Sequence, residues 1–296
     1  MIRRSPFLLG VFLISGAVLM LQSAETRLLS VIAWYYLAFF AISVAILGLT
    51  IGASWVYLRR SSFEDPARLA PTLATFSRLS AIAVPVSLLC QLSLITSFAP
   101  TLAVVTSWGL LLAAMTLPYV FAGVVLSLAL TRSPFPVSLV YGTDLVGAGL
   151  GCLGVVGVMN VVDGPTTMIL IGFIAALASV AFARSAEAPG SEATSWWKLG
   201  AGSWWRRPMP IAAGLLALAG LNLVSPLAIK PIVVKDMREL ELLSRNEHWN
   251  PYSRVVAYKA YTGVPPLWGP SPKLPPTQAT YVPMNIDGMA GTNMVR

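Results

Sequence analysis

The stretch LAVVTSWGLLLAAMTLPYVFAGVVLSLAL, from Leu102 to Leu130, contains no charged residue. It is longer than the roughly 20 residues that a helix needs to cross a bilayer. Comparable apolar stretches recur on both sides of it, and a soluble core rarely needs such runs. This segment therefore predicts a membrane protein built from transmembrane helices.

The composition of the whole chain supports this prediction. Of the 296 residues, 56% are hydrophobic and 11% are charged, whereas soluble domains carry about 25% charged residues. The formal net charge is +8, but the basic residues lie in short loops and form no stripe typical of nucleic-acid binding. We expect the lipid bilayer as a partner, and no nucleic acid.

Seven apolar segments can be delimited along the chain. They are Phe7 to Gln22, Leu29 to Leu58, Leu73 to Phe98, Leu102 to Leu130, Val137 to Val162, Thr166 to Ala183 and Ile211 to Ile229. The first is short and follows two arginines, as in a signal peptide, but no convincing cleavage site follows it, so we interpret it as a retained helix. The predicted fold is an all-α polytopic membrane helix bundle of about seven spans over residues 1–230. An extramembrane tail over 231–296 completes the chain.

The basic residues indicate the orientation of the spans. If all seven segments cross, one side receives most of them: Arg3, Arg4, Arg59, Arg60, Arg68, Arg132, Arg184, Lys198, Arg206 and Arg207. The short loops on the opposite side hold Arg27 and little else. Because cytoplasmic loops are enriched in basic residues, we expect a multi-pass inner-membrane protein with a cytoplasmic N-terminus.

The fifth span carries YGTDLVGAGLGCLG, from Tyr141 to Gly154. Gly149, Gly151 and Gly154 match the GxGxxG pattern of dinucleotide-binding loops, but that pattern requires a preceding strand, and here it lies inside an apolar run. We interpret Gly147, Gly151 and Gly154 as helix-packing residues. Gly147 and Gly151 are four residues apart, so they share one helix face and let another helix approach closely.

The Asp144 side chain places a carboxylate in or near the hydrocarbon core of the bilayer, where a charge is costly and needs a partner or water. One interpretation places it near the cytoplasmic end of its span, hydrogen-bonded to Thr143, to Tyr141 or to a neighbouring loop arginine such as Arg132. The other makes it part of a polar intramembrane site with Glu25 and Arg27, which we otherwise expect to pair locally in the turn between the first two spans. Three further polar residues are expected to form interhelical hydrogen bonds: Gln91, Asn160 and Asn222.

No metal or cofactor is expected. Cys90 and Cys152 lie within predicted spans, where cysteine usually behaves as a small apolar residue. His248 has no cysteine or second histidine near it in the sequence, and zinc sites need three or four such ligands.

The tail differs in composition from the spans. Val234 to Arg245 predicts a short amphipathic helix. Two strand-like runs, from His248 to Tyr261 and from Thr280 to Ile286, flank a Pro/Gly-rich loop and predict a β-hairpin. A lone hairpin is marginally stable in water, so this one needs more strands or a partner surface. The candidate partner-docking residues are Trp249, Tyr252 and Asp287.

Several motifs resemble those of a known family. Trp249-Asn250-Pro251-Tyr252-Ser253-Arg254-Val255, followed by a strand and Ile286-Asp287-Gly288, resembles the N-terminal hairpin region of spermidine-synthase-like proteins. The membrane part resembles the bacterial subgroup that carries multi-pass domains ahead of such an enzyme domain. The motifs of this part are Glu25-Thr26-Arg27-Leu28-Leu29-Ser30 with Trp34-Tyr35-Tyr36, and Tyr141-Gly142-Thr143-Asp144-Leu145-Val146-Gly147-Ala148.

The resemblance implies an aminopropyltransferase with a Rossmann-like catalytic domain. That domain would supply a glycine-rich nucleoside-binding loop and an aspartate that deprotonates the attacking amine. These positions would follow Arg296, so we assign no catalytic residue and expect this chain to be non-catalytic on its own. Seven crossings also place the tail outside, whereas a synthase domain would be expected in the cytoplasm. Either one segment does not cross, with the short first run as the candidate, or the tail is external and is no conventional synthase; the charge distribution favours the external tail.

Three functions stay open at this stage. The chain is an accessory or structural subunit of a larger membrane complex, the membrane half of a split aminopropyltransferase-like enzyme, or a small-solute transporter that uses Asp144. No inverted repeat is evident between the two halves of the chain, which disfavours the transporter.

Overall fold

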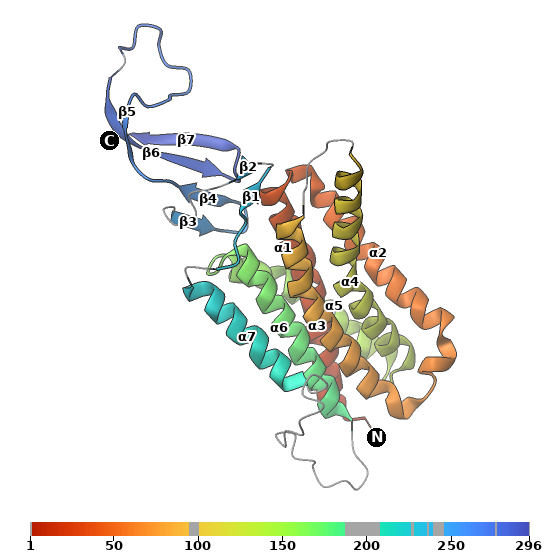
Figure 1. Cartoon of the computed structure of the whole chain (residues 1–296). Coiled ribbons are helices and arrows are strands. Elements are labelled where there is room, and N and C mark those ends of the chain that lie inside the picture. The colour runs from red at the N-terminus through yellow and green to blue at the C-terminus, as the bar shows by residue number, and fades with distance from the viewer. Residues whose placement is uncertain are drawn as a thin grey trace.

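The computed structural model describes residues 2–94, 101–186, 208–225, 228–235, 237–238, 246–275 and 277–295. Within these ranges, seven α-helices form one bundle, and a small β-sheet lies at one end of it (Figure 1). The helices are α1 (Arg4–Ile32), α2 (Ala38–Leu58), α3 (Leu69–Ser93), α4 (Leu102–Arg132), α5 (Val137–Met159), α6 (Gly164–Ser185) and α7 (Pro208–Val224). The N-terminus lies at the end of the bundle away from the sheet (Figure 1).

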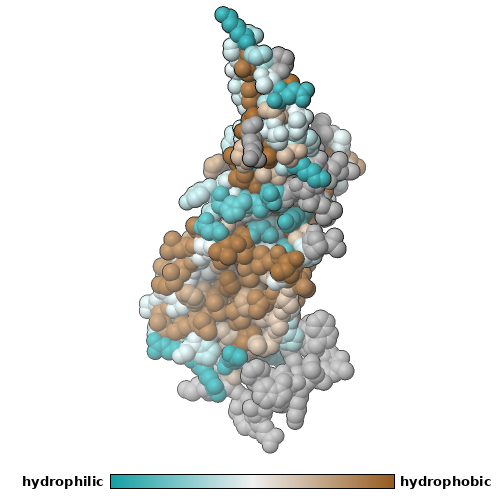
Figure 2. All heavy atoms as spheres, turned by 90° about the vertical axis from the view of Figure 1, so that its left-hand side faces the viewer, coloured by the Kyte–Doolittle hydropathy of each residue, from teal (hydrophilic) through white to brown (hydrophobic). Residues whose placement is uncertain are grey.

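Six of the described helices, α1 to α6, are long and apolar enough to cross a membrane. The seventh, α7, has 17 residues, and at 1.5 Å per residue it is about 25 Å long, slightly less than the hydrocarbon core of a bilayer. Figure 2 shows a broad hydrophobic band across the helical part of one face, with hydrophilic residues on both sides of the band. The expected helix bundle is confirmed, with six helices of spanning length where seven were predicted.

The boundary between the first two helices differs from the prediction. Helix α1 continues through Glu25 and Arg27 to Ile32, and the chain turns at residues 33–37 before α2 begins. The prediction placed the two charges in a turn because hydropathy records the cost of a buried charge but not the partners that satisfy it. The turn itself contains Trp34 and two tyrosines, whose apolar rings resemble the continuation of a span.

The helices pack against one another in a small number of pairs. Helix α1 packs against α5 and α6, α2 against α4, α3 against α4 and α6, and α7 against α6. The backbone N–H of Arg3 donates to Ser185 O at 2.8 Å, which joins the start of α1 to the end of α6. Asp163 precedes helix α6, and its side chain caps the first turn, which contains Pro165.

The tail forms an antiparallel sheet of five strands instead of a lone hairpin. Strand β4 (Arg254–Ala257) lies between β3 (Asn246–Trp249) and β6 (Ala279–Ile286). Strand β5 (Tyr261–Gly263) also pairs with β6. Strand β7 (Ala290–Val295) pairs with β6 as well, in a register of its own. The predicted pairing across the Pro/Gly-rich loop is therefore present in β4 and β6.

The turn between β6 and β7 has a special backbone conformation. Asp287 has a φ of 51° and Gly288 a φ of 75°. Aspartate and glycine are among the residues that adopt positive φ at least cost. The Asp-Gly pair thus lets the chain reverse and add β7 to the sheet.

The amphipathic helix predicted over Val234 to Arg245 begins instead as extended chain. Val234 lies in β1 (Val233–Val234), which pairs with β2 (Met237–Arg238). The backbone N–H of Lys235 donates to Ile32 O at 2.8 Å. This bond satisfies a carbonyl at the end of α1 that has no partner within the helix, and it fixes the start of the tail against α1. The rest of the predicted helix lies outside the described residues.

Candidate functional site

Glu25 is fully buried in the bundle, on the face of α1 that meets α3 and α4. The Tyr119 hydroxyl of α4 donates to Glu25 Oε2 at 2.8 Å. From α3, Ser87 Oγ and Gln91 Nε2 each lie 3.4 Å from Glu25 Oε1, and Gln91 Nε2 donates to Ser87 Oγ at 3.0 Å. These four residues, here named the Glu25 cluster, connect three helices through polar groups.

Arg27 connects the bundle to the sheet. The prediction that it pairs with Glu25 is wrong, because its guanidinium forms a two-point ion pair with the Asp287 carboxylate in the turn after β6. The side chains of Arg27 and Asp287 are 9% and 21% exposed, so the pair is largely shielded from water. The backbone N–H of Arg254 also donates to Asp287 Oδ1 at 2.8 Å. Lys235 Nζ donates to Asp287 O at 2.6 Å.

Burial affects the charge of Lys235 at this junction. It lowers the pKa of the Lys235 ammonium group, and the nearby Asp287 carboxylate opposes that shift. The ammonium group also lies 5.9 Å from the centre of the Trp34 ring, in the turn between α1 and α2. Lys235 therefore contacts both the bundle and the sheet.

A second set of contacts fixes β3 and β4 on the end of the bundle. Glu247 accepts hydrogen bonds from Arg254 Nε at 2.8 Å and from Trp249 Nε1 at 2.6 Å. The Trp249 ring packs on Gly164 at the start of α6, where an added Cβ would lie 2.8 Å from the ring. The strand register explains the arrangement: Trp249 and Arg254 are cross-strand partners, and Glu247 shares a face with Trp249 two residues away.

The three candidate docking residues have different surroundings. Trp249 is 5% exposed against α6, and Asp287 is engaged by Arg27. Tyr252 is 85% exposed. Two of the three side chains are thus used within this chain, and only Tyr252 faces outward.

Asp144 lies apart from the Glu25 cluster. Its Oδ1 accepts a hydrogen bond from Ser15 Oγ of α1. Ser15 and Glu25 are about 15 Å apart along the axis of α1, at 1.5 Å per residue. The structure therefore does not bring Asp144 together with Glu25 and Arg27, and its partner is a serine of α1 instead of Arg132.

Helix α5 approaches α1 through glycine. A Cβ at Gly151 would lie 2.5 Å from Gly16 O, and a Cβ at Gly147 would overlap Phe12 O. At Gly154 the nearest atoms belong to the Met20 side chain, at 3.9 Å. Close contact between the two helices thus depends on Gly147 and Gly151, whereas Gly154 faces a looser environment.

Polar contacts also gather at the start of α6. Thr166 N donates to Asp163 Oδ1 at 2.7 Å, and Asn222 Nδ2 of α7 donates to Thr166 Oγ1 at 2.8 Å. Burial raises the pKa of Asp163, while the hydrogen bonds from Thr166 lower it. Asn222 and Gln91 thus link helices as predicted, whereas Asn160 donates to a carbonyl of its own helix at 2.8 Å.

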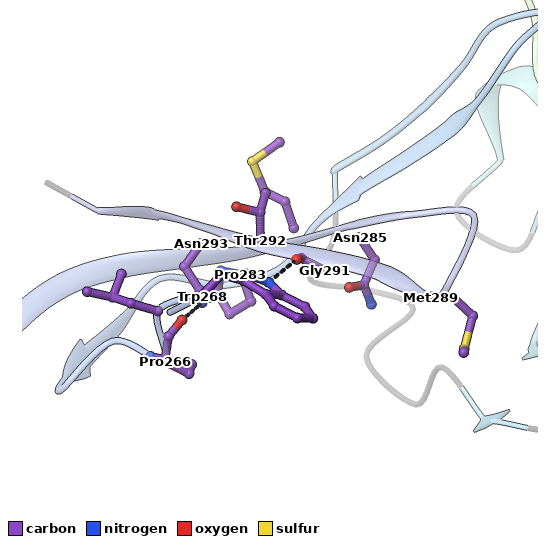
Figure 3. A pocket seen from close by; sticks show the side chains of 10 residues that line it. Pro266, Trp268, Pro283, Asn285, Met289, Gly291, Thr292 and Asn293 are labelled. Atoms are coloured by element: carbon purple, nitrogen blue, oxygen red, sulfur yellow. Dashed lines mark hydrogen bonds between the residues drawn. The ribbon is translucent and has the colours of Figure 1, made fainter. Parts of the chain in front are cut away.

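A pocket of about 440 Å³ lies on the sheet, between β6, β7 and the Pro-rich loop (Figure 3). Trp268 Nε1 donates to Gly291 O at 2.9 Å, and Asn293 Nδ2 donates to Pro266 O, so the loop is held over the strands (Figure 3). The residues that line the pocket are Pro266, Leu267, Trp268, Pro283, Met284, Asn285, Met289, Gly291, Thr292 and Asn293. The pocket offers apolar and amide contacts but no acid, base or charged group.

Sequence reasoning missed several residues of these networks, among them Ser15, Ser87, Tyr119, Lys235, Glu247 and Arg254. A tyrosine inside the apolar run of α4 was the available signal for Tyr119, because a buried tyrosine hydroxyl usually finds a partner. Among the described residues, no group of three His, Cys, Asp or Glu side chains could hold a metal ion.

Comparison with protein-family models, curated proteins and solved structures gave no match.

Proposed function

We propose that this chain is an accessory membrane subunit that resembles the membrane part of spermidine-synthase-like proteins. The observation that carries the proposal is the ion pair between Arg27 and Asp287, which fixes the sheet on one end of the helix bundle. Arg27 belongs to the motif at residues 25–30 and Asp287 to the motif at 286–288. Two separate segments that carry the resemblance thus meet in one contact.

A sheet held in a fixed position suits a docking platform, because a preorganised surface loses less entropy when a partner binds. Strand β7 lies at an edge of the sheet and exposes Met294 and Val295. Such an edge can accept a further strand. Tyr252 adds an exposed aromatic ring, of a type enriched at protein interfaces. In the proposed complex the bilayer surrounds the helices and a protein partner covers the sheet.

The proposed location is a bacterial inner membrane, with the N-terminus in the cytoplasm. Arginines such as Arg3, Arg60 and Arg132 lie at the ends of helices remote from the sheet (Figure 1). Loops rich in basic residues favour the cytoplasmic side. The sheet then lies outside the cytoplasm, a position that suits an accessory role better than nucleoside chemistry.

The transporter alternative receives little support from the contacts. The space between helices beside Val84, Pro118 and Tyr119 measures about 10 Å³, which is room for one water at most. Asp144 is hydrogen-bonded to Ser15 instead of facing that space. A split enzyme is a variant of the accessory role, in which the partner carries the catalytic half.

Co-purification tests the proposal. The native protein would be extracted in mild detergent, its complex sized, and every co-purifying protein identified. We expect a stoichiometric partner that is lost in Asp287→Asn and retained in Glu64→Gln, which removes an exposed charge in the connection between α2 and α3. A partner with a glycine-rich nucleoside-binding domain identifies the split enzyme, and methylthioadenosine production then checks its activity. A solitary monomer contradicts the accessory role.

A further inference from the structure

We propose that the Glu25 cluster is a binding site for one alkali cation, and that Na⁺ is the ion its dimensions fit best. The ligands are the Glu25 carboxylate of α1 with the Ser87 hydroxyl and the Gln91 amide oxygen of α3. Tyr119 of α4 orients the carboxylate. This inference does not depend on the accessory role.

The charge of the cluster calls for a cation. The groups that face Glu25 from α3 and α4 are neutral: Ser87, Gln91 and Tyr119. The buried Arg78 also belongs to α3 but lies about 13 Å before Ser87 along the helix axis. On α1 itself, Arg27 is engaged by Asp287. Helix α2 has no charged residue, and the charged residues of α5 and α6 are Asp144, which lies about 15 Å away along α1, and Arg184 at the far end of the bundle. Among the described residues, no basic side chain is paired with Glu25. An uncompensated buried carboxylate is costly at membrane depth, and a monovalent cation makes this site neutral.

The spacing of the oxygens matches ligands of an ion better than hydrogen-bonded partners. Ser87 Oγ lies 3.4 Å from Glu25 Oε1, beyond the range of about 2.5–3.0 Å for an O–H···O hydrogen bond. Two oxygens at a right angle around an ion, each at about 2.4 Å as in Ca²⁺ sites, lie about 3.4 Å from one another. Na⁺ has nearly the same radius as Ca²⁺, whereas the larger K⁺ needs wider spacing.

Gln91 supplies an independent indication of a ligand. The residue is 1% exposed, and its Oε1 is buried without a hydrogen-bond partner. An unpaired buried acceptor is costly. Its amide lies beside the carboxylate, with Nε2 at 3.4 Å from Glu25 Oε1, and a half-turn about the last side-chain bond brings the oxygen to that side. A cation satisfies the amide oxygen and the carboxylate together.

Tyr119 and the ligand types restrict the kind of ion. The Tyr119 hydroxyl occupies Glu25 Oε2 at 2.8 Å, so Oε1 is the oxygen directed toward Ser87 and Gln91. Carboxylate, hydroxyl and carbonyl oxygens suit hard cations and not soft transition metals. Calcium sites usually collect several carboxylates, whereas this cluster has one. The single carboxylate of the cluster therefore matches a singly charged ion.

Thermal unfolding of the full chain in detergent tests the proposal. We compare NaCl, KCl and choline chloride at equal ionic strength, so that general screening is constant. At a Na⁺ concentration of about 100 times Kd, the Tm should rise by about 5–10 °C over choline chloride, with a smaller rise in KCl. Glu25→Gln should lose the rise. The matched control Asp144→Asn, which removes the other carboxylate between helices, should keep it.

Two results would overturn the proposal: a Tm that does not distinguish Na⁺ from choline, or an equal Na⁺ effect in Glu25→Gln. If Glu25→Gln does not fold, Ser87→Ala replaces it and should raise the half-saturating Na⁺ concentration at least about tenfold. An unchanged concentration in Ser87→Ala contradicts the proposed ligand set.

Dicyclohexylcarbodiimide gives a second readout, because it modifies protonated carboxyl groups in apolar surroundings. Na⁺ should protect Glu25 from this modification, and choline should not. Equal modification in both salts would mean that the cluster binds only a proton, and the cation site would be refuted.

Discussion

The ion pair between Arg27 and Asp287 should contribute measurably to the attachment of the sheet. Asp287→Asn removes the charge but keeps the size of the side chain, an oxygen that can accept from Arg254 N, and a residue that tolerates a φ of 51°. Exposed ion pairs contribute up to about 1 kcal/mol, and breaking a fully buried pair costs about 3–5 kcal/mol. With side chains 9% and 21% exposed, the pair lies between these cases, and we expect a loss of about 2 kcal/mol.

Amide hydrogen exchange of the full chain in detergent measures this loss locally. Because each 1.4 kcal/mol is a factor of ten, amides of β6 and β7 should exchange about 30-fold faster in Asp287→Asn. Amides in the middle of α6 should keep their rates. Arg27→Gln should behave like Asp287→Asn, and the double variant should show a coupling of about 2 kcal/mol between the two sites.

The control for this prediction is an exposed ion pair. Glu64→Gln breaks the ion pair with Arg60, whose side chains are 57% and 70% exposed, and should cost less than about 0.5 kcal/mol. If the effects of Arg27→Gln and Asp287→Asn are additive within about 0.5 kcal/mol, the pair does not attach the sheet and the reasoning fails.

Further variants test the other contacts by Tm in detergent. Gly151→Ala should lower the Tm by an amount corresponding to about 1–3 kcal/mol, because the added Cβ would meet the backbone of α1. The added Cβ of Gly149→Ala would meet no atom, so this control should be neutral. Equal effects of the two variants would contradict the packing. Trp249→Ala should cost about 3–5 kcal/mol and the exposed Tyr252→Ala less than about 0.5 kcal/mol, and a reversed order would contradict the docking of the sheet on α6. Burial raises the pKa of Asp163, so its contribution to stability is full below the ordinary aspartate value of about 3.9 and is lost as pH rises through the raised value. Asparagine caps a helix equally well, so the Tm advantage of the native chain over Asp163→Asn should shrink from about pH 4 upward, and a constant difference would contradict the shift.

The bundle could be predicted from sequence because long uncharged runs have few alternatives to membrane-length helices. The ends of these helices were less accessible. Glu25 and Arg27 were placed in a turn, although partners on α3 and in the β6–β7 turn hold them in α1. These partners lie far away in the sequence, and no local pattern encodes a contact between residues 27 and 287.

The sheet shows the same limit. The strands on both sides of the Pro/Gly-rich loop were predicted from their β-branched residues and from Asp287-Gly288. The short strand at Val234 was not, because the chain is fixed there by a hydrogen bond from Lys235 N to the end of α1, a contact distant in the sequence. Trp249 was interpreted as a partner-docking residue, yet the glycine at the start of α6 leaves room for its ring within this chain. Tertiary contacts decided both cases.

The most direct test of the account is the sidedness of the two ends of the bundle. With Cys90 and Cys152 replaced by alanine, a single cysteine would be placed at the exposed Ser5 or at the exposed Thr277. Intact cells that express each variant would then be treated with a membrane-impermeant maleimide. We predict labelling of Thr277→Cys in intact cells and labelling of Ser5→Cys only after the membrane is opened. Labelling of both under the same condition would contradict an odd number of crossings and the proposed position of the sheet.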